Sequence, residues 1–577
     1  MIKLFTSCIG KYKKYAIIAP IGIIFEVLFE VLIPFMMNYI SDALNAEDMT
    51  ALLSIGGLMV LFAILSLICG ILSGVTAAKA SAGFAANLRK KLFLKIQNFS
   101  FKNTDKFSTS SLITRLTTDV ENVQMAFMML IRGFVRAPIM IIMATTFAFA
   151  TNVKLALIFV VALPLLAGTL ILIISRAHKR FKTLLKVFDD MNAVEQENLI
   201  GIRAVKAFVR EDYETEKFVA ISERARDAHV KAERILIFIT PIMMMIMFAC
   251  VMAVIGFGGM MTFDDSGFDV VSLTSYLTYT TQILMSLMMM GMILVIVVIS
   301  RASLTRIKEV LDEDIDIKDD TADKNLFVSD GSIDFSDVNF SYSGDSDKSV
   351  LNNINLHIES GETIGIIGAT GSAKTTLVQM IPRLYDVDTG SVKVGGHNVK
   401  EYKIKNLRNA VSMVLQKNVL FSGTIKDNLK WGNENATDEE IVEATKAACA
   451  HDFIMSFPDG YDTELGQGGV NVSGGQKQRL CIARALLKKP KILILDDSTS
   501  AVDTSTDKSI RESLKKIKGI TVIIVAQRIA SVGSADRVIV MDEGRIDAFD
   551  TPQELLKSNT IYQEVYNSQM KGAQQNG

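Results

Sequence analysis

The chain contains 577 residues, of which 49% are hydrophobic and 21% are charged, and its net charge is −1. This length exceeds what one ordinary domain needs, and the balanced charge excludes a nucleic-acid-binding role that depends on a basic surface. Five cysteines without disulfide or metal-ligand spacing fit a reducing cytosol and a membrane interior; they are Cys8, Cys69, Cys250, Cys449 and Cys481.

Hydropathy divides the chain into two parts. Long apolar runs fill residues 1–300, whereas residues 325–577 alternate strand-like and helix-like segments, as soluble α/β domains do. Six apolar runs are long enough to cross about 30 Å of hydrocarbon as helices, and the first is too long for the apolar region of a signal peptide. We place the spans at about 15–40, 53–78, 128–151, 154–176, 234–262 and 272–299.

The predicted architecture is a six-helix membrane domain over residues 1–310, a linker over 311–330 and an α/β domain over 331–577. Basic residues set its orientation, because they remain on the cytosolic side of a membrane. They precede the first span or follow the second and fourth, at Lys11, Lys13, Lys14, Arg89, Lys90, Lys91, Lys95, Arg176, Lys179, Arg180 and Lys182. The opposite segments, 41–50 and 263–269, carry acids and no lysine or arginine. Both termini and the α/β domain are therefore expected in the cytosol, beneath a plasma membrane.

A Gly-rich run connects an apolar strand at 363–367 with a helical start at 376–378. Such a turn points backbone N–H groups at phosphates, and the helix N-terminus favours their charge. Lys374 is expected to reach the outer phosphates and Thr375 to hold magnesium. Ala373 replaces the usual glycine, at a cost of about 1–2 kcal/mol if this position requires a positive φ. The predicted nucleotide-binding residues are Gly368, Thr370, Gly371, Ser372, Ala373, Lys374, Thr375 and Thr376.

A second anion cradle stands at 471–479, Asn-Val-Ser-Gly-Gly-Gln-Lys-Gln-Arg, before a helical run at 480–487. Together with the phosphate loop, Gln416 and Tyr342, it resembles the ATP-binding cassette (ABC) transporter family. The resemblance extends over the whole chain. It implies a P-loop ATP-binding cassette fused to the membrane domain of an exporter half-transporter, which uses ATP and Mg²⁺ and pairs with a second half-transporter in the lipid bilayer.

The resemblance also implies a role for each matching residue. Tyr342 would stack on adenine, Lys374 and Thr375 would hold phosphate and Mg²⁺, and Asp496 would hold Mg²⁺ through water. Gln416 would contact the metal and link the nucleotide to the membrane helices. The remaining assignments place Asp503 at a dimer interface, and Ser473, Gly474, Gly475 and Gln476 on the ATP of the opposite subunit.

Two departures from the family pattern fall on catalytic positions. Asp497 stands where such cassettes carry Glu, and Gln527 stands where they carry His; Gln416 is the third catalytic candidate. Asp is one methylene shorter than Glu, and a misplacement near 1 Å costs on the order of 100-fold in rate. Gln cannot carry the proton or the positive charge that His can, and the last histidine of the chain is His451.

A further departure is Gln467, in a motif that usually has Glu, whereas the signature at 471–479 is intact. These features predict the degenerate-site subunit of a heterodimeric exporter. A homodimer remains possible in principle, but it would contain two weak sites.

The cytosolic loops at 79–127 and 177–233 are helical in pattern. Within them, residues 99–119 and 195–208 resemble the coupling segments that dock on the ATP domains of such exporters. The alternative is a solvated, charged helix without a docking role.

Two carboxylates in the first span are candidates for a functional role. Glu26 and Glu30 lie one helical turn apart and share a face, and intramembrane carboxylates are functional candidates by default. They either meet a cationic substrate or pair with basic groups near span 3, at Arg132 or Arg136. Three prolines are expected to bend their helices: Pro20, Pro34 and Pro241.

Spans 5 and 6 are rich in methionine, which suits promiscuous apolar binding as well as ordinary helix packing. The group comprises Met243, Met244, Met245, Met247, Met252, Met285, Met288, Met289, Met290 and Met292. The chain is thus predicted to export amphiphilic small molecules, drugs or lipids, with ATP. A regulatory subunit that gates a catalytic partner and a peptide exporter are the alternatives.

Overall fold

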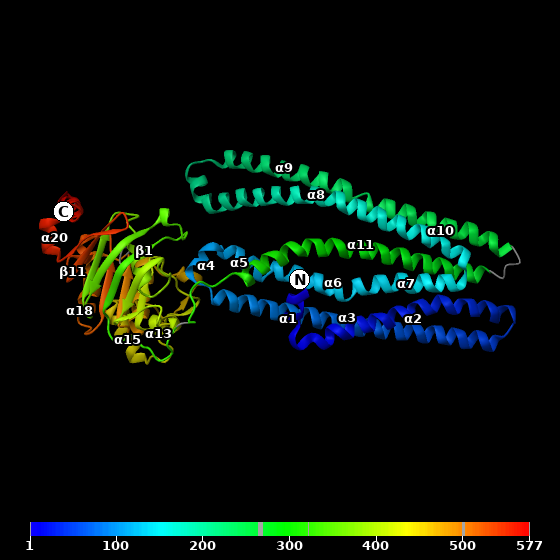
Figure 1. The fold of residues 1–577 in the computed structure, drawn as a ribbon, viewed down its shortest axis with the longest axis horizontal. Helices are drawn as coiled ribbons and strands as arrows, with labels where there is room; N and C mark the ends of the chain where they lie inside the picture. The colour runs from blue at the N-terminus through cyan, green and yellow to red at the C-terminus, as the bar shows by residue number, and fades with distance from the viewer. Residues whose placement is uncertain (1, 264–268, 321, 499–501, 576–577) are drawn as a thin grey trace. The chain divides into compact units, whose positions relative to one another are not determined.

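The computed structural model describes residues 2–263, 269–320, 322–498 and 502–575 (Figure 1). It divides into two compact units. The first comprises Met1–Gln97 and Thr109–Glu313, and the second comprises Asn98–Ser108 and Asp314–Gly577. Residues 98–108, which the sequence analysis assigned to the membrane domain, therefore lie with the second unit.

The first unit is helical. Within the described residues, six helical segments are long and apolar enough to cross a membrane, which confirms the six-span prediction. Several run well beyond the apolar stretch, as expected for helices that continue into the cytosol. The helices are α1 (Ile2–Ile9), α2 (Lys13–Asn45), α3 (Met49–Gln97), α5 (Thr109–Leu116), α6 (Thr118–Ile131), α7 (Gly133–Thr151), α8 (Val153–Ala207), α9 (Glu211–Leu236), α10 (Ile239–Phe263) and α11 (Val270–Asp312).

One buried cluster of this unit forms where α2, α7, α8, α10 and α11 meet. Ile23, Val27 and Val31 repeat at four-residue spacing and present one buried stripe of α2. Across from them, Phe159 of α8 stacks on Tyr276 of α11 with ring centroids 5.6 Å apart. Close packing and the hydrogen bond from the Tyr279 hydroxyl to the Val31 carbonyl oxygen at 3.2 Å hold this cluster, because lipid is itself apolar and does not drive helices together.

The predicted prolines differ in position. Pro20 and Pro34 lie inside the continuous helix α2. Pro241 instead lies in the first turn of α10, directly after the break that separates α9 from α10. Proline is tolerated in a first turn, because the N–H that it lacks has no helical partner there. Pro241 thus marks a helix start and not a bend. Of the predicted outer segment 263–269, residues 264–268 lie outside the described residues.

The second unit is a layered α/β fold. A six-stranded sheet has the order β12-β11-β3-β10-β9-β6, parallel except for β12, and a four-stranded antiparallel sheet has the order β2-β1-β4-β5. The strands are β1 (Ile333–Phe340), β2 (Leu351–Ile358), β3 (Thr363–Gly368), β4 (Thr389–Val394), β5 (His397–Asn398), β6 (Val411–Val414), β7 (Gly423–Thr424), β8 (Glu464–Leu465), β9 (Ile492–Asp496), β10 (Thr521–Val525), β11 (Arg537–Asp542) and β12 (Arg545–Asp550).

Central strands β9 and β10 are buried at every position, as parallel strands covered on both faces are. The carboxyl ends of β3, β9 and β10 meet at one edge, where the loops to the helices carry polar groups. The helices are α4 (Phe101–Lys106), α12 (Lys374–Met380), α13 (Ile404–Ala410), α14 (Ile425–Lys430), α15 (Asp438–Ala447), α16 (His451–Met455), α17 (Gly474–Leu487), α18 (Thr504–Lys515), α19 (Ile529–Val532), α20 (Pro552–Ser558) and α21 (Thr560–Gln575).

Candidate nucleotide site

The loop between β3 and α12 is shaped around the ammonium group of Lys374. Its Nζ donates to the carbonyl oxygens of Gly368 at 2.9 Å and Ala369 at 2.8 Å, and to Ser372 Oγ at 3.3 Å. Burial lowers the pKa of Lys374, against the opposing effect of the nearby carboxylates. A Cβ at Gly368 would lie 2.2 Å from the Met541 carbonyl oxygen, so the close passage of the loop requires glycine there. The result is a loop that carries a positive charge beside a helix N-terminus, as phosphate binding needs.

Ala373 adopts φ 70° and ψ 21°, in the left-handed region. Ala373 thus has the positive φ on which the predicted cost depends, and it occupies a conformation that favours glycine. It is the N-cap residue of α12 and makes no side-chain capping bond. The strain thus lies at the point where the phosphate loop turns into the helix.

Asp496 ends β9 with only 1% of its surface exposed. Thr375 Oγ1 donates to its Oδ1 at 2.9 Å. Burial raises the pKa of Asp496, and the neighbouring Asp497 adds to this effect. A buried carboxylate beside a hydroxyl is the hard oxygen set that Mg²⁺ prefers, and a divalent cation would offset the cost of its charge. The residues present therefore fit the predicted ion.

The carboxylate of Asp497 is held by two neutral amides. Its Oδ2 accepts from Gln527 Nε2 at 3.2 Å and from Gln416 Nε2 at 3.4 Å. Its backbone has φ 46°, and its N–H continues the sheet by donating to Val525 O at 3.0 Å. The structure thus brings the three predicted catalytic candidates together.

Tyr342 lies beside the phosphate loop with 43% of its surface exposed. Its hydroxyl hydrogen-bonds to Thr376 Oγ1 at 3.0 Å, and its ring contacts Tyr385 edge-on at 5.2 Å. One face of an aromatic ring near the cradle is what an adenine base would need for stacking.

The signature residues start helix α17. Ser473 Oγ accepts from the N–H of Gln476 at 3.3 Å, and Gln476 Oε1 accepts from the N–H of Ser473 at 2.8 Å. This capping box leaves Gly474 and Gly475 in the first helical turn, where backbone N–H groups have no helical partner. Gln476, predicted to contact nucleotide, uses its side-chain oxygen within its own helix.

Two other predicted residues are exposed, at Gln467 and Asp503. Asp503 is the N-cap of α18 and accepts from the N–H of Thr506 at 2.9 Å, which lowers the pKa of its carboxyl. Its predicted neighbours 500 and 501 lie outside the described residues.

The sequence analysis expected residues 99–119 to dock on an ATP domain, but it named no partner for them; in this structure residues 98–108 contact Tyr385 of the cassette. The hydroxyl of Tyr385 donates to Asp105 Oδ2 at 2.6 Å, and the ring of Phe101 meets that of Tyr385 at 6.0 Å. A Ser100–Asn103 capping box starts the short helix α4 that carries them. The capping pattern predicts a helix start, and the resemblance predicts a docking role, but neither identifies Tyr385 as the partner.

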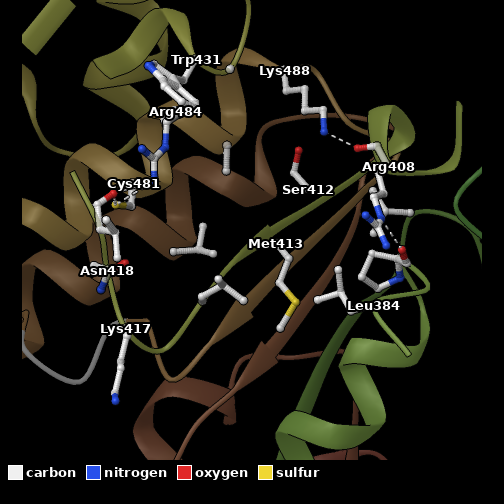
Figure 2. Close-up of a pocket in the computed structure, with 17 residues that line it drawn as sticks. Leu384, Arg408, Ser412, Met413, Lys417, Asn418, Trp431, Cys481, Arg484 and Lys488 are labelled. Atoms are coloured by element: carbon white, nitrogen blue, oxygen red, sulfur yellow. Dashed lines mark hydrogen bonds between the residues drawn. The ribbon is translucent and has the colours of Figure 1, made fainter. Parts of the chain in front are cut away.

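A groove on the cassette is basic. It encloses about 320 Å³ and its charged lining residues are all cations, at Arg408, Lys417, Arg484 and Lys488 (Figure 2). Burial lowers the pKa of both Arg408 and Lys488. Three further buried atoms on its wall have no hydrogen-bond partner in the described part of the chain: Ser412 Oγ, Asn418 Oδ1 and Arg484 Nη1.

In the membrane unit, the carboxylates of α2 pair with Arg136 and not with Arg132. Arg136 Nη2 donates to Glu30 Oε2 at 2.6 Å, and Nη1 donates to Glu26 Oε1. Gly70 of α3 packs against the Glu26 carboxylate, where an added Cβ would lie 3.2 Å away. Of the two roles left open, pairing is the one observed in this structure.

A separate hollow of about 840 Å³ lies between α8 and α10. Of the predicted methionines only Met245 lines it, and Met260 and Met261, which the prediction omitted, line it as well. Lys154 supplies the single charge among its lining residues. Met243 is instead buried in the helix core.

Comparison with known proteins places these features in context. Residues 16–288 match the model of the ABC transporter transmembrane region, and residues 351–500 match that of the ABC transporter domain. The chain is 36% identical to an uncharacterized ABC transporter ATP-binding protein of Bacillus subtilis, with 96% of this chain and 97% of the relative covered. It is 33% identical to a putative multidrug export ATP-binding/permease protein of Staphylococcus aureus, with 99% and 100% covered.

Among solved structures, that of a bacterial Atm1-family ABC exporter with ATP bound is similar in fold. The TM-score is 0.83 with 23% sequence identity, and the match covers 97% of this chain and 99% of the other.

Proposed function

Because the chain belongs to the ABC transporter family and has the fold of its exporters, we propose that it is the slow-site subunit of a heterodimeric exporter of amphiphilic molecules. ATP hydrolysis coupled to export across the membrane, with the ATP-binding domain in the cytosol, follows from the family itself. The identity of the site residues, the asymmetry and the substrate class are the proposal.

The observation that carries the asymmetry is the pair of amide bonds to Asp497. A general base must be within reach of the attacking water and able to take its proton. Here the short carboxylate is oriented by Gln416 and Gln527, at 3.4 and 3.2 Å. A glutamine at 527 offers a neutral donor and no proton to exchange. The site therefore keeps the groups that bind ATP and weakens those that cleave it.

The residues divide between binding and hydrolysis in this proposal. Lys374 and the loop N–H groups hold the phosphates, Tyr342 contacts the base, and Thr375 with Asp496 would hold Mg²⁺, which supplies charge neutralisation at the phosphates. Asp497 acts on the attacking water as a general base, but less effectively than a glutamate would, so hydrolysis is slow. Ser473, Gly474 and Gly475 contact the ATP of the other subunit in this proposal, and the backbone N–H groups of Gly474 and Gly475 have no partner within the helix that they start.

The basic groove supports the presence of a second subunit. Four cationic side chains line it, and three polar atoms of its wall, one of them on Arg484, have no hydrogen-bond partner among the described residues. The turn between α8 and α9 offers apolar surface, because Phe208 and Val209 are 76% and 80% exposed, whereas Glu211 and Glu214 near it are paired with Lys206 and Lys217. In this proposal, a matching loop from a partner half-transporter packs against the apolar part of the groove lining. The groove does not choose between a like and an unlike partner; Asp497 and Gln527 favour the unlike one.

The hollow between α8 and α10 supports an amphiphilic substrate. Apart from Lys154 its lining is apolar and includes three methionines, which adapt to varied shapes. One ammonium beside a flexible apolar surface suits a molecule with a polar head and an apolar body. The multidrug-export relative points to the same class.

Two experiments test the proposal. The chain is tagged in its native membrane and what purifies with it is identified; an equimolar half-transporter with Glu and His at the positions of Asp497 and Gln527 is the expected result. A dimer of this chain alone that hydrolyses ATP at tens per second would overturn the proposal. In parallel, the change Asp497→Glu with Gln527→His should raise ATP turnover by about tenfold or more.

The same double change separates an exporter subunit from a regulatory subunit. If both sites must hydrolyse for export, transport of a fluorescent amphiphile rises with turnover. If slow ATP release at this site is what gates the partner, turnover rises while the amount transported per ATP falls.

A further inference from the structure

The C-terminal helix holds the backbone of the segment that carries Gln527. The side-chain amide of Gln569, on α21, donates from Nε2 to the Gln527 carbonyl oxygen at 2.8 Å. Its Oε1 accepts from the N–H of Ile529, also at 2.8 Å. Two bonds of good length from one planar amide fix both the position and the orientation of the backbone between them.

The two bonds from Gln569 form a clamp, and this clamp supplies a hydrogen-bond acceptor that the residues next to Ile529 in sequence do not provide. Helix α19 has four residues, and its N-cap, Arg528, makes no side-chain capping bond. The N–H of Ile529 begins that helix and has no partner within it. Gln569 supplies the missing acceptor from 40 positions further along the chain. Residues 527–532, called the switch segment, are thus held by a remote helix and not by their own turn.

The helix that carries Gln569 is itself anchored. Tyr562 is 2% exposed, and its N–H donates to Asn559 Oδ1 at 2.8 Å. Val565 and Tyr566 pack against the cassette core. They precede Gln569 by one helical turn, and residues at that spacing share a face. The amide of Gln569 therefore extends from the face of α21 that is fixed to the core.

The clamp holds the backbone of Gln527, whose side chain belongs to the proposed catalytic pair. The carbonyl of Gln527 is bound by Gln569, and the side chain of the same residue donates to Asp497 Oδ2 at 3.2 Å. A second bond, from Ser531 Oγ to Asp507 Oδ2 at 3.0 Å, ties α19 to α18 on its other side. The N–H of Ala526 donates to the Ile366 carbonyl oxygen at 3.1 Å, so the backbone is held by the sheet before residue 527 and by α18 after it. Gln569 holds the two peptide groups between these points.

We propose that Gln569 is a positioning residue for the side chain at 527, so that the C-terminal helix sets the rate of ATP turnover at this site without touching the nucleotide. The inference rests on the proposed role of the Asp497–Gln527 pair. It makes α21 a regulatory element: anything that lifts this helix releases the switch segment and slows hydrolysis.

The test is a mutant cycle in the full-length chain. Gln569→Ala is made in the Asp497→Glu/Gln527→His chain and, separately, in a Gln527→Ala chain, and single-turnover hydrolysis of radiolabelled ATP is followed. The backbone clamp is the same in both chains, but only the first has a side chain for it to position. We expect the single-turnover rate constant to fall on the order of tenfold in the first, with the kcat of multiple turnover falling alongside it and KM for ATP unchanged, and no further loss in the second.

The matched control is Gln563→Ala. Gln563 lies on the same helix and donates to the Leu556 carbonyl oxygen at 2.9 Å, so the change removes a similar bond away from the switch. Hydrogen exchange provides a readout that does not depend on activity: Gln569→Ala should speed exchange in residues 527–532, and Gln563→Ala should not.

Each result decides the inference. An equal loss of kcat in both backgrounds, or faster exchange with unchanged kcat, would show that Gln569 only stabilises the fold. If the Asp497→Glu/Gln527→His chain turns over no faster than the native chain, the proposed slow site is wrong. The effect of Gln569→Ala on the native chain's single turnover then decides the clamp by itself.

Discussion

The hydroxyl of Tyr385 donates a 2.6 Å hydrogen bond to Asp105, 280 residues earlier in the chain. The bond joins a loop between two membrane helices to the cassette, within one compact unit. The ring of Tyr385 also contacts that of Tyr342, beside the phosphate loop, at 5.2 Å. Tyr385 thus links Tyr342, which is predicted to stack on the base of ATP, to Asp105 in the loop between two membrane helices.

Tyr385→Phe should reduce transport more than ATP hydrolysis. The change keeps the ring contacts of Tyr385 and removes only its bond to Asp105. We expect turnover within about twofold of the native chain and a several-fold loss of substrate transported per ATP. The measurement is ATP turnover and amphiphile transport in the same proteoliposomes.

Tyr402→Phe is the control for this change, because the Tyr402 hydroxyl donates to Val394 O within the cassette alone. Equal effects of the two changes on coupling would argue against a specific role for the contact with Asp105.

Ala373→Gly should stabilise the nucleotide-free protein. A left-handed alanine costs about 1–2 kcal/mol, and the added flexibility of glycine in the unfolded chain offsets roughly 0.5–1 kcal/mol of that. A net gain of about 0.5–1 kcal/mol in the free energy of unfolding is expected from denaturant titration. Ala369→Gly, in the same loop but without a positive φ, should bring no gain. A loss at Ala373→Gly would mean that the loop relaxes when the protein is free.

Asp496→Asn should raise stability without nucleotide and abolish the stabilising effect of Mg²⁺ with ATP. Because burial raises the pKa of Asp496, the folded state binds a proton more tightly than the unfolded state. Stability therefore falls as pH rises from the ordinary carboxyl range through the raised pKa, and the full cost is present at neutral pH. Asparagine removes that cost and still accepts a bond from Thr375.

The check is the thermal midpoint at acidic and neutral pH, with and without Mg²⁺ and ATP. The thermal midpoint of the native protein should be lower at neutral pH than at acidic pH, and the difference should be smaller for the variant. An Asp496→Asn protein that Mg²⁺ still stabilises together with ATP would place the ion elsewhere.

Arg136→Met should destabilise the membrane unit strongly. The change leaves Glu26 and Glu30 without the cation that pairs with both. Removal of one partner from a buried ion pair costs about 3–5 kcal/mol, and partial exposure of Glu30 and Arg136 reduces this. Glu26→Gln with Glu30→Gln in the same chain should restore most of the lost thermal midpoint in detergent.

This set also decides whether the carboxylates meet substrate. If the neutral triple variant is stable and exports a cationic amphiphile normally, Glu26 and Glu30 act only in packing. A stable variant with selectively weaker export of cations would assign them a part in binding.

The sequence was informative where one stretch determines its own structure. Apolar length predicts the membrane helices, and the Gly-rich turn at 368–375 predicts the cradle around Lys374. It was uninformative where the partner comes from elsewhere in the chain. Nothing near Glu26 indicates Arg136 over Arg132, and nothing near Gln527 indicates Gln569. Such choices depend on which helix faces pack together, and the helical period determines a face without naming its neighbour.

Residues 98–108 show that the cassette's folding unit and its stretch of sequence do not coincide. A protein cut at residue 331 would lack Asp105 and Phe101, and would leave the Tyr385 hydroxyl and one edge of its ring without their partners. Grafting this cassette onto another membrane domain would therefore require transplanting the loop as well. Exchange of either segment alone would leave Tyr385 or Asp105 without its hydrogen-bond partner.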